Sequence, residues 1–258
     1  MDFKDQVAIV TGSSSGIGEA AAVGFAKGGG RVVINYSKNE QGALSVVDKC
    51  ISSGGDAIAI QADVSIDSHC REVVDQAKKK WGTVDILVNN AGRTKFVKHN
   101  DLDGLNKDDF EEIYALNTIA PFQMIRAARE SLKVSNNGAV VNMSSIAGLR
   151  AYGSSVAYAA SKAALNSLTL SLARALGPEG IRVNSVCPGF VGTDWFYKAY
   201  GKETVDRLIE KQINETPLGR AGKAEDITGA ILFFASSWST HITGQMLAVD
   251  AGMILGKI

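Results

Sequence analysis

The 258-residue sequence predicts an α/β fold, a single domain built on a doubly wound parallel sheet of about seven strands with helices on both faces. Three observations support this prediction. Short apolar runs alternate with longer amphipathic segments along the whole chain. Most of the runs are β-branched and apolar on both sides, as expected for strands that are buried from both faces. No linker, repeat or low-complexity tract divides the chain, whose length suits one large domain.

The predicted elements follow one another as strand, helix, strand. The strands begin with QVAIVT, RVVINY, AIAIQAD and DILVNN and continue with AVVNMSS, RVNSVCP and MLAVD; they cover residues 6–11, 31–36, 57–63, 85–90, 139–145, 182–188 and 246–250. The helix-like segments between them include 16–28, 41–53, 67–81, 108–133, 156–176 and 224–236. Because each strand leads into a helix before the next strand, right-handed crossovers place the strands parallel and cover both faces of the sheet.

A glycine-rich turn, TGSSSGIG at 11–18, joins the first predicted strand to the first predicted helix. Gly12, Gly16 and Gly18 allow the backbone to approach a ligand closely, and the N–H groups at the start of the following helix can bind a diphosphate. A glycine turn alone is weak evidence, but the strand before it and the helix after it are the context that a dinucleotide site requires. We therefore predict that this turn binds a dinucleotide.

The segment YAASK places Tyr158 four residues before Lys162. In a helix this spacing stacks both side chains on one face, which brings an ammonium close to a phenol. The positive charge is expected to lower the pKa of the phenol from its ordinary value of about 10, so that Tyr158 can act as an acid or a base. The alternative is an ordinary amphipathic helix, in which the tyrosine fills a core and the lysine reaches water.

Composition excludes several classes of protein. Lys+Arg and Asp+Glu balance at 27 each, so no global charge favours nucleic acid or an anionic membrane. Cys50, Cys70 and Cys187 lack the spacing of a zinc site or a disulfide framework. We predict no metal site, and a surface role for His99. With no secretory segment and no apolar run long enough to cross a bilayer, we expect a cytoplasmic protein without nucleic-acid or membrane partners.

Taken together, the motifs resemble those of the short-chain dehydrogenase/reductase family, in its compact single-domain branch. The resemblance covers essentially the whole chain, implies a Rossmann-like fold, and rests on motifs in the family's order. These are TGSSSGIG, the ADV of 62–64, the NNAG of 89–92, Asn117 in ALN, Ser145 in NMSS, YAASK, and CPGFVGT from 187 to 193. The overall pattern is similar to 3-oxoacyl-[acyl-carrier-protein] reductases and to glucose dehydrogenases.

The resemblance implies a role for each motif. Tyr158 is the acid or base, Lys162 also holds the nicotinamide ribose, Ser145 hydrogen-bonds the substrate oxygen, and Asn117 holds a water that relays protons to Lys162. The implied cofactor-binding residues are Gly12, Ser14, Ser15, Gly16, Ile17, Gly18, Tyr36, Ser37, Lys38, Asp63, Val64, Asn90, Ala91, Gly92, Tyr158, Lys162, Pro188, Gly189, Val191 and Thr193.

The end of the second predicted strand bears on the choice of cofactor. An NAD-specific site places a carboxylate there to bind the ribose 2′-hydroxyl, whereas this chain has Asn35, Tyr36, Ser37 and Lys38. Hydroxyl groups and Lys38 can receive a 2′-phosphate, so NADP(H) is favoured and NAD(H) is the alternative. Ser15 stands where many NADP-using relatives carry an arginine, and Lys38 as a plain surface charge is the competing interpretation.

The expected activity is interconversion of a carbonyl and a secondary alcohol by hydride transfer, with a 3-oxoacyl thioester or ketone as substrate. A sugar or polyol dehydrogenase is the alternative, and a non-catalytic dinucleotide sensor is the third interpretation.

Residues 190–217 are expected to form a mobile lid of two short helices, in which Trp195, Phe196, Tyr197 and Tyr200 either line an apolar site or pack the lid. Arg126, Arg129 and Lys133 are weighed as a carrier-protein patch, although a solvated helix face is favoured. The resemblance also implies a homotetramer.

Overall fold

The computed structural model describes residues 1–256, without the side chains of residues 194 and 198–200. Seven parallel strands form one sheet in the order β3-β2-β1-β4-β5-β6-β7. The strands are β1 (Val7–Val10), β2 (Arg31–Tyr36), β3 (Asp56–Gln61), β4 (Ile86–Asn89), β5 (Ala139–Met143), β6 (Arg182–Pro188) and β7 (Met246–Val249). The predicted single-domain α/β fold with a parallel sheet is therefore confirmed.

The chain changes direction across the sheet at β1. β1 pairs with β2 on one side, with Val10 opposite Ile34, and with β4 on the other, with Val10 opposite Val88. The first three strands progress one way from β1 and the remaining four the other way. In open parallel sheets such a reversal leaves a crevice at the carboxyl ends of the strands, where ligands bind.

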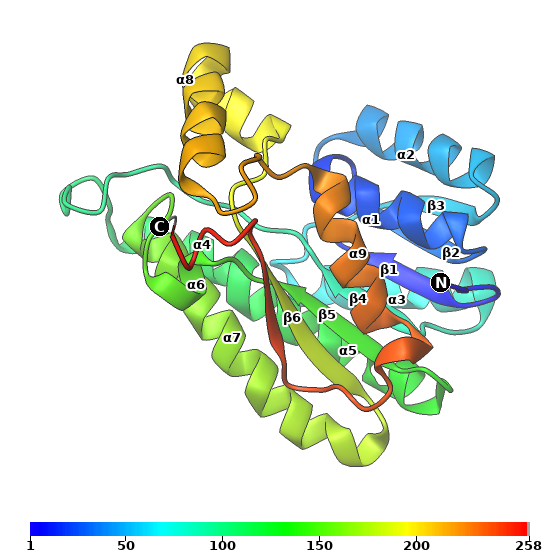
Figure 1. Cartoon of the computed structure of the whole chain (residues 1–258). Helices are drawn as coiled ribbons and strands as arrows, with labels where there is room; N and C mark the ends of the chain where they lie inside the picture. The colour runs from blue at the N-terminus through cyan, green and yellow to red at the C-terminus, as the bar shows by residue number, and fades with distance from the viewer. Residues whose placement is uncertain (257–258) are drawn as a thin grey trace.

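Helices cover both faces of the sheet, each over its own apolar cluster (Figure 1). One cluster packs α1 (Gly16–Lys27), α2 (Glu40–Ser52) and α9 (Ala224–Ala235) on the sheet through side chains such as Phe25 and Ile231. The other packs α3 (Asp67–Trp81), α5 (Ala120–Val134) and α7 (Val156–Leu176) through side chains such as Met124 and Leu176. The strands between them are buried from both sides, which explains why the sequence shows continuous apolar runs.

The single helix predicted at 108–133 is three segments. α4 (Lys107–Tyr114) passes into a π-helix at Ala115–Ile119, and α5 follows. Pro121 gives the physical reason: it has no N–H, so the carbonyl of Asn117, four residues earlier, loses its usual helical donor. This proline was the signal in the sequence that the helix is interrupted. The π turn buries Asn117 fully and directs it towards α7.

The chain between β6 and α9 rises from the carboxyl edge of the sheet. α8 (Asp194–Glu215) stands above the sheet at that edge (Figure 1), and Gly201, at φ 72° and ψ 167°, divides it into two helices. A pair of helices in this stretch agrees with the arrangement expected for residues 190–217. α6 (Ala147–Arg150), a short helix that the sequence analysis did not predict, packs against α7 near the same edge. No helix of the described residues is long and apolar enough to span a membrane.

At the opposite end of β6, Arg182 is buried, with only 8% of its surface exposed. Its guanidinium donates to the carbonyls of Phe234 at 2.6 Å, Ser236 at 3.3 Å and Ser239 at 3.2 Å. It also donates to the Ser239 hydroxyl at 2.6 Å and to the side-chain carbonyl of Asn137 at 3.0 Å. Apart from Asn137, these acceptors lie in the last turn of α9 or just after it, so one cation satisfies the carbonyl groups there, where the helix dipole is negative.

Candidate active site

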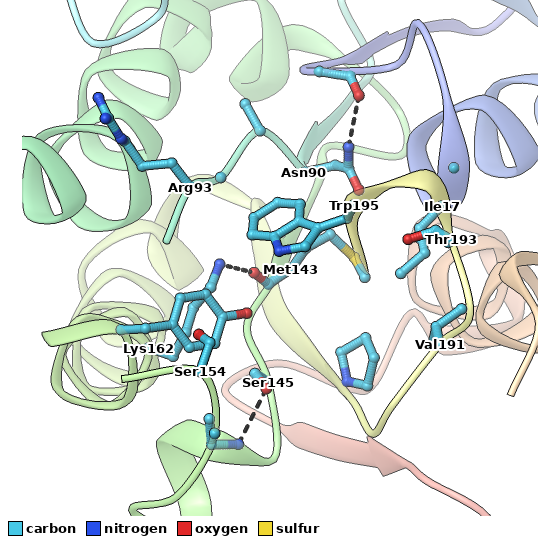
Figure 2. A pocket seen from close by; sticks show the side chains of 18 of the residues that line it. Ile17, Asn90, Arg93, Met143, Ser145, Ser154, Lys162, Val191, Thr193 and Trp195 are labelled. Carbon is cyan, nitrogen blue, oxygen red and sulfur yellow. Dashed lines mark hydrogen bonds between the residues drawn. The ribbon is translucent and has the colours of Figure 1, made fainter. Parts of the chain in front are cut away.

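The first turns of α7 carry the predicted catalytic pair. Ser155 caps the helix by accepting the N–H of Tyr158 at 3.2 Å. Four residues along a regular helix then place the Lys162 Nζ 5.7 Å from the centre of the Tyr158 ring. The ammonium is buried and donates to the carbonyl of Met143 at 2.7 Å (Figure 2). The predicted pairing of phenol and ammonium is thus present in the structure.

Ser145 faces this pair from the loop beyond β5. The predicted strand reached residue 145, but β5 ends at Met143, so Ser145 lies in the turn that leads into α6. Its Oγ accepts the N–H of Ala147 at 3.1 Å (Figure 2), which fixes the position of the side chain. In this bond Ser145 is the acceptor, so its own O–H can be directed towards Tyr158 or towards a ligand.

The electrostatics of the pair differ from the expectation based on charge alone. Burial raises the pKa of Tyr158 to about 12, and the interaction with Ser145 acts in the opposite direction. Burial also lowers the pKa of Lys162 to about 8. The predicted lowering of the phenol pKa is therefore wrong for the protein alone, because desolvation by burial is the largest influence on Tyr158. At neutral pH Tyr158 is a protonated donor and Lys162 is mostly cationic.

Asn117 connects the π-helix to α7 and to the loop after β4. Its Oδ1 accepts the N–H of Arg93 at 2.8 Å, and its Nδ2 donates to the Arg93 carbonyl at 2.9 Å and to the Ser161 hydroxyl at 3.0 Å. Both N–H donors of the amide are therefore used within the protein, and Oδ1 accepts one hydrogen bond. The main-chain carbonyl of Asn117, which Pro121 leaves without its helical donor, is a further acceptor to which a water could be held.

The glycine turn forms a close-fitting cradle at the carboxyl end of β1. A Cβ at Gly18 would lie 2.5 Å from the Nδ2 of Asn90, and one at Gly12, where φ is +62°, would lie 2.9 Å from the Cα of Ala91. No side chain caps α1 at Ser15, whereas Asn39, Asn106 and Ser155 cap α2, α4 and α7. The N–H groups of the first turn of α1 are thus left for a ligand, which fits the diphosphate of a dinucleotide.

A cleft of about 1030 Å³ joins this cradle to the pair on α7. Of the residues predicted from the sequence, the following line it: Gly12, Ser15, Gly16, Ile17, Ser37, Lys38, Asp63, Val64, Asn90, Ala91, Gly92, Ser145, Tyr158, Lys162, Pro188, Gly189, Val191 and Thr193. Four predicted residues, Ser14, Gly18, Tyr36 and Asn117, are not in the lining. Gly18 and Asn117 support it from behind, and Tyr36 belongs to the core beneath α2.

Some lining residues were not among the predicted site residues. Asn35 accepts the N–H of Gly12 at 3.2 Å and donates to the carbonyls of Ile60 and Ala62 at 3.3 and 3.1 Å, which fixes the glycine turn against β3. A polar residue inside an otherwise apolar strand was the available signal. Ser154 forms a 2.7 Å hydrogen bond with the hydroxyl of Thr94 and lies far from it in sequence, so no local pattern pointed to it.

The start of α8 contributes aromatic side chains to the cleft. Trp195 and Phe196 both line it, and Phe196 also stacks on Phe190 and Phe96, with ring centres 4.7 and 5.9 Å apart. The two roles weighed for these aromatics, lining and packing, are therefore combined in Phe196. Tyr197 is outside the lining, and the side chain of Tyr200 lies outside the described residues.

Other candidates from the sequence have structural roles. Arg126 is paired with Asp67 at 2.5 Å and Arg129 with Glu179, which agrees with a solvated helix face rather than a free basic patch. His99 is half-buried, and its Nε2 has no hydrogen-bond partner. Within residues 1–256, apart from the omitted side chains, no three His, Cys, Asp or Glu side chains gather as a metal site.

Comparison with known proteins places the chain in a family. Residues 12–254 match the family model described as Enoyl-(Acyl carrier protein) reductase. The chain is 41% identical over 246 residues, or 95% of each protein, to ketoacyl reductase 2 of the granaticin polyketide synthase of Streptomyces violaceoruber. It is 38% identical to the L-rhamnose 1-dehydrogenase (NAD(P)(+)) of Azotobacter vinelandii, over 97% of each.

A solved structure gives the same result. The reductase LugOII, which catalyses keto-reduction at C1 in lugdunomycin biosynthesis, is 31% identical and superposes with a TM-score of 0.88 over 98% of this chain and 100% of its own. Sequence, fold and the cleft with its tyrosine, lysine and serine therefore agree. The chain belongs to the short-chain dehydrogenase/reductase family and is an NAD(P)-dependent oxidoreductase that acts between carbonyl and CH–OH groups.

Proposed function

We propose that the protein is an NADPH-dependent ketoreductase whose substrate is an apolar ketone or a 3-oxoacyl thioester. The observation that carries the proposal is the placing of two hydroxyl donors, Ser145 and Tyr158, on a cleft whose other wall is apolar. Phe190, Phe196 and Met253 contribute to that wall. A ligand held there meets donors at its oxygen and apolar surface along its body.

In the proposed mechanism this chain supplies the proton and orients the carbonyl. The cofactor supplies the hydride when it is bound. Tyr158, which is protonated at neutral pH, donates its proton to the carbonyl oxygen. Ser145 donates a hydrogen bond to the same oxygen and stabilises the negative charge that develops on it. Tyrosinate then regains a proton from solvent, through Lys162 and a water held at the Asn117 carbonyl.

Lys162 has a second function in this proposal. It holds the nicotinamide ribose, and its charge stabilises the tyrosinate that the proton transfer creates. The other predicted residues that line the cleft form its cofactor half, with Asp63 and Val64 at the adenine. Two hydrogen bonds from Ser65 to the Asp63 carboxylate, at 2.7 and 3.0 Å, help to lower the pKa of Asp63 and keep it ionised.

The preference for NADPH rests on the end of β2. Ser37 and Lys38 are exposed side chains that line the cleft, and no carboxylate follows β2 at this point. Among the described residues, Lys38 takes part in no ion pair, so its charge is available to a 2′-phosphate. NAD(H) remains the second cofactor, because Ser15 stands where many NADP-using relatives carry an arginine.

Replacing Ser37 by Asp is expected to raise the Kd for NADPH by roughly tenfold or more, since like charges in contact cost about 1.4 kcal/mol or more. The Kd for NADH should stay nearly the same, because a 2′-hydroxyl can donate to the new carboxylate. Fluorescence titration of both cofactors measures this. Ser52→Asp, at an exposed serine outside the cleft, is the control. Equal changes for both cofactors would remove Ser37 from the phosphate site.

Cofactor binding is also expected to depend on pH. The pKa of Lys162 is lowered to about 8, so the ammonium is lost as the pH rises through that value. The Kd for NADPH should therefore increase between about pH 7 and pH 9, since neutral Lys162 keeps fewer donors for the ribose. Adenosine 2′,5′-bisphosphate lacks that ribose and serves as the control ligand, whose Kd should not change. A parallel rise for both ligands would assign the effect to another group.

The lowered pKa of Lys162 also makes the stability of the fold depend on pH. The pKa of Lys162 is about 8 in the folded protein and 10.5 in the unfolded chain. Between these two pH values the unfolded chain therefore binds more protons than the folded protein. Stability therefore gains from this group as the pH rises through that window, which is opposite in direction to the loss of cofactor affinity.

The substrate panel tests the proposed function itself. Purified protein is mixed with NADPH and with β-keto thioesters, β-keto esters, cyclic ketones, or sugar lactones, and the loss of cofactor absorbance is followed. Turnover of the apolar keto compounds supports the proposal. Turnover confined to sugar-type compounds would favour the alternative, to which the L-rhamnose 1-dehydrogenase relative gives specific support. Cofactor binding without any turnover would favour the sensor.

Three further expectations belong to the proposal. Residues 190–217 act as the lid of the cleft. The chain assembles as a homotetramer through α5 and α7, and half-exposed Phe122 and Leu170 on these helices support this assignment. The cytoplasm is the expected location, and the three cysteines, all buried and free, are compatible with a reducing compartment.

A further inference from the structure

Trp195, in the first turn of α8, places its indole inside the cleft. Figure 2 shows the ring in the middle of the cavity, between the side of Ile17 and Thr193 and the side of Lys162 and Met143. It is 38% exposed, although large aromatic side chains normally bury more of their surface.

The far edge of the indole reaches the innermost corner of the cofactor half. A Cβ built on Gly92 would lie 3.3 Å from the Oδ1 of Asn117, 3.6 Å from the Nζ of Lys162 and 3.8 Å from the Cη2 of Trp195. These three atoms therefore surround one point. Lys162 is the residue assigned above to the nicotinamide ribose, so the indole and that part of the cofactor compete for the same corner.

The segment before Trp195 bridges the cleft from the other side. The Cβ and Cγ2 of Thr193 lie 3.7 Å from a Cβ built on Gly16, which places Thr193 against the glycine turn. The start of α8 thus spans from the glycine turn to Lys162. The indole lies at the corner near Gly92. The adenine half of the cleft, lined by Ser37, Lys38 and Asp63, lies away from this bridge.

Trp195 is held less firmly than its neighbour. Phe196 stacks on two other rings, with centres 4.7 and 5.9 Å away. In the described part of the chain, the Trp195 ring nitrogen makes no hydrogen bond and its ring no stacking pair. Phe196 therefore anchors the start of the lid, and the indole can leave the cleft without breaking a polar contact.

We propose that Trp195 determines the affinity of the cleft for complete dinucleotides: its indole occupies the nicotinamide corner and must move out before the nicotinamide half binds. This inference rests on the proposed function. An apparent Kd equals the intrinsic Kd divided by the fraction of protein that is competent to bind. Trp195 in the corner lowers that fraction for NADPH, but not for a ligand that occupies only the adenine half.

The test compares two ligands on three proteins by titration calorimetry. Trp195→Ala should lower the Kd for NADPH by roughly three- to tenfold, as expected when a blocked fraction is released. The Kd for adenosine 2′,5′-bisphosphate should stay the same. Trp238→Ala, at a 70% exposed tryptophan outside the cleft, is the matched control and should change neither value.

Each other outcome is decisive. A higher or unchanged NADPH Kd in Trp195→Ala, or equal changes for both ligands, would overturn the inference. Failure of both ligands to bind the wild-type protein would instead overturn the proposed function, so the two failures are distinguishable.

A second readout follows the indole itself. The sequence has three tryptophans, so a protein carrying Trp81→Phe and Trp238→Phe reports Trp195 alone. Acrylamide quenching of its fluorescence should change on addition of NADP⁺ and stay unchanged with adenosine 2′,5′-bisphosphate. The same quenching with and without NADP⁺ would show that the indole does not move, and would contradict the proposal even if the affinities shifted.

Discussion

Tyr158→Phe is expected to lower the kcat for carbonyl reduction by about 10²- to 10⁴-fold, the range that a positioned general acid contributes. The Kd for NADPH should stay nearly unchanged. Only the hydroxyl is removed, so the ring keeps its volume and its position 5.7 Å from the Lys162 Nζ. Single-turnover kinetics with saturating NADPH measures the chemical step, and fluorescence titration measures binding.

A control separates the loss of the acid from the loss of any tyrosine. Tyr114→Phe changes the same functional group on α4, outside the lining of the cleft, and should leave kcat near the wild-type value. Turnover of Tyr158→Phe close to that of the wild type would remove Tyr158 from the mechanism. A large increase in the NADPH Kd would instead show that the phenol acts through cofactor binding.

Arg182→Met is expected to give the largest loss of stability, about 3–5 kcal/mol of the free energy of unfolding. Methionine fills much of the buried volume but donates no hydrogen bond. The carbonyls of Phe234, Ser236 and Ser239 and the side chain of Asn137 are then left without this donor. For a chain of this size the melting temperature should fall by roughly 10 °C.

Two further variants test the explanation for Arg182. Arg174→Met removes an exposed arginine from the last turn of α7 and should change stability by less than about 0.5 kcal/mol. Arg182→Lys keeps the charge but reaches fewer acceptors, so its stability should lie between those of the wild type and Arg182→Met. If Arg182→Lys were as unstable as Arg182→Met, charge at this position would be irrelevant. A melting temperature of Arg182→Met within the error of the wild type would contradict the assignment.

The sequence predicted those features that depend on local pattern. β-branched runs and the helices between them predicted the parallel sheet, because both faces of each strand are buried and the pattern records that burial. The spacing of Tyr158 and Lys162 predicted their contact, since helix geometry alone determines it. The glycine turn was predictable for the same reason, because φ values of +62° and +63° at Gly12 and Gly16 favour glycine.

What the sequence could not predict depends on contacts between distant segments. The raised pKa of Tyr158 follows from its burial in the folded protein, and a charge four residues away does not reveal burial. Ser154 and Thr94 meet across 60 positions. The position of Trp195 beside Gly92 depends on how α8 rests over the sheet. The residue types were visible in each case, but their surroundings were not.

The π turn at 115–119 also determines how α5 is rotated about its axis relative to α4. A π turn contains one residue more than an α turn, and one residue rotates a helix by about 100°. The apolar stripe of α5 is therefore offset from that of α4 by that angle. A single-residue deletion at 115 or 116 would remove this offset and would rotate Asn117 away from Ser161 and Arg93, while Pro121 would still lack the N–H that a regular α-helix needs. Length variation at this point is thus far less tolerable than in an exposed loop.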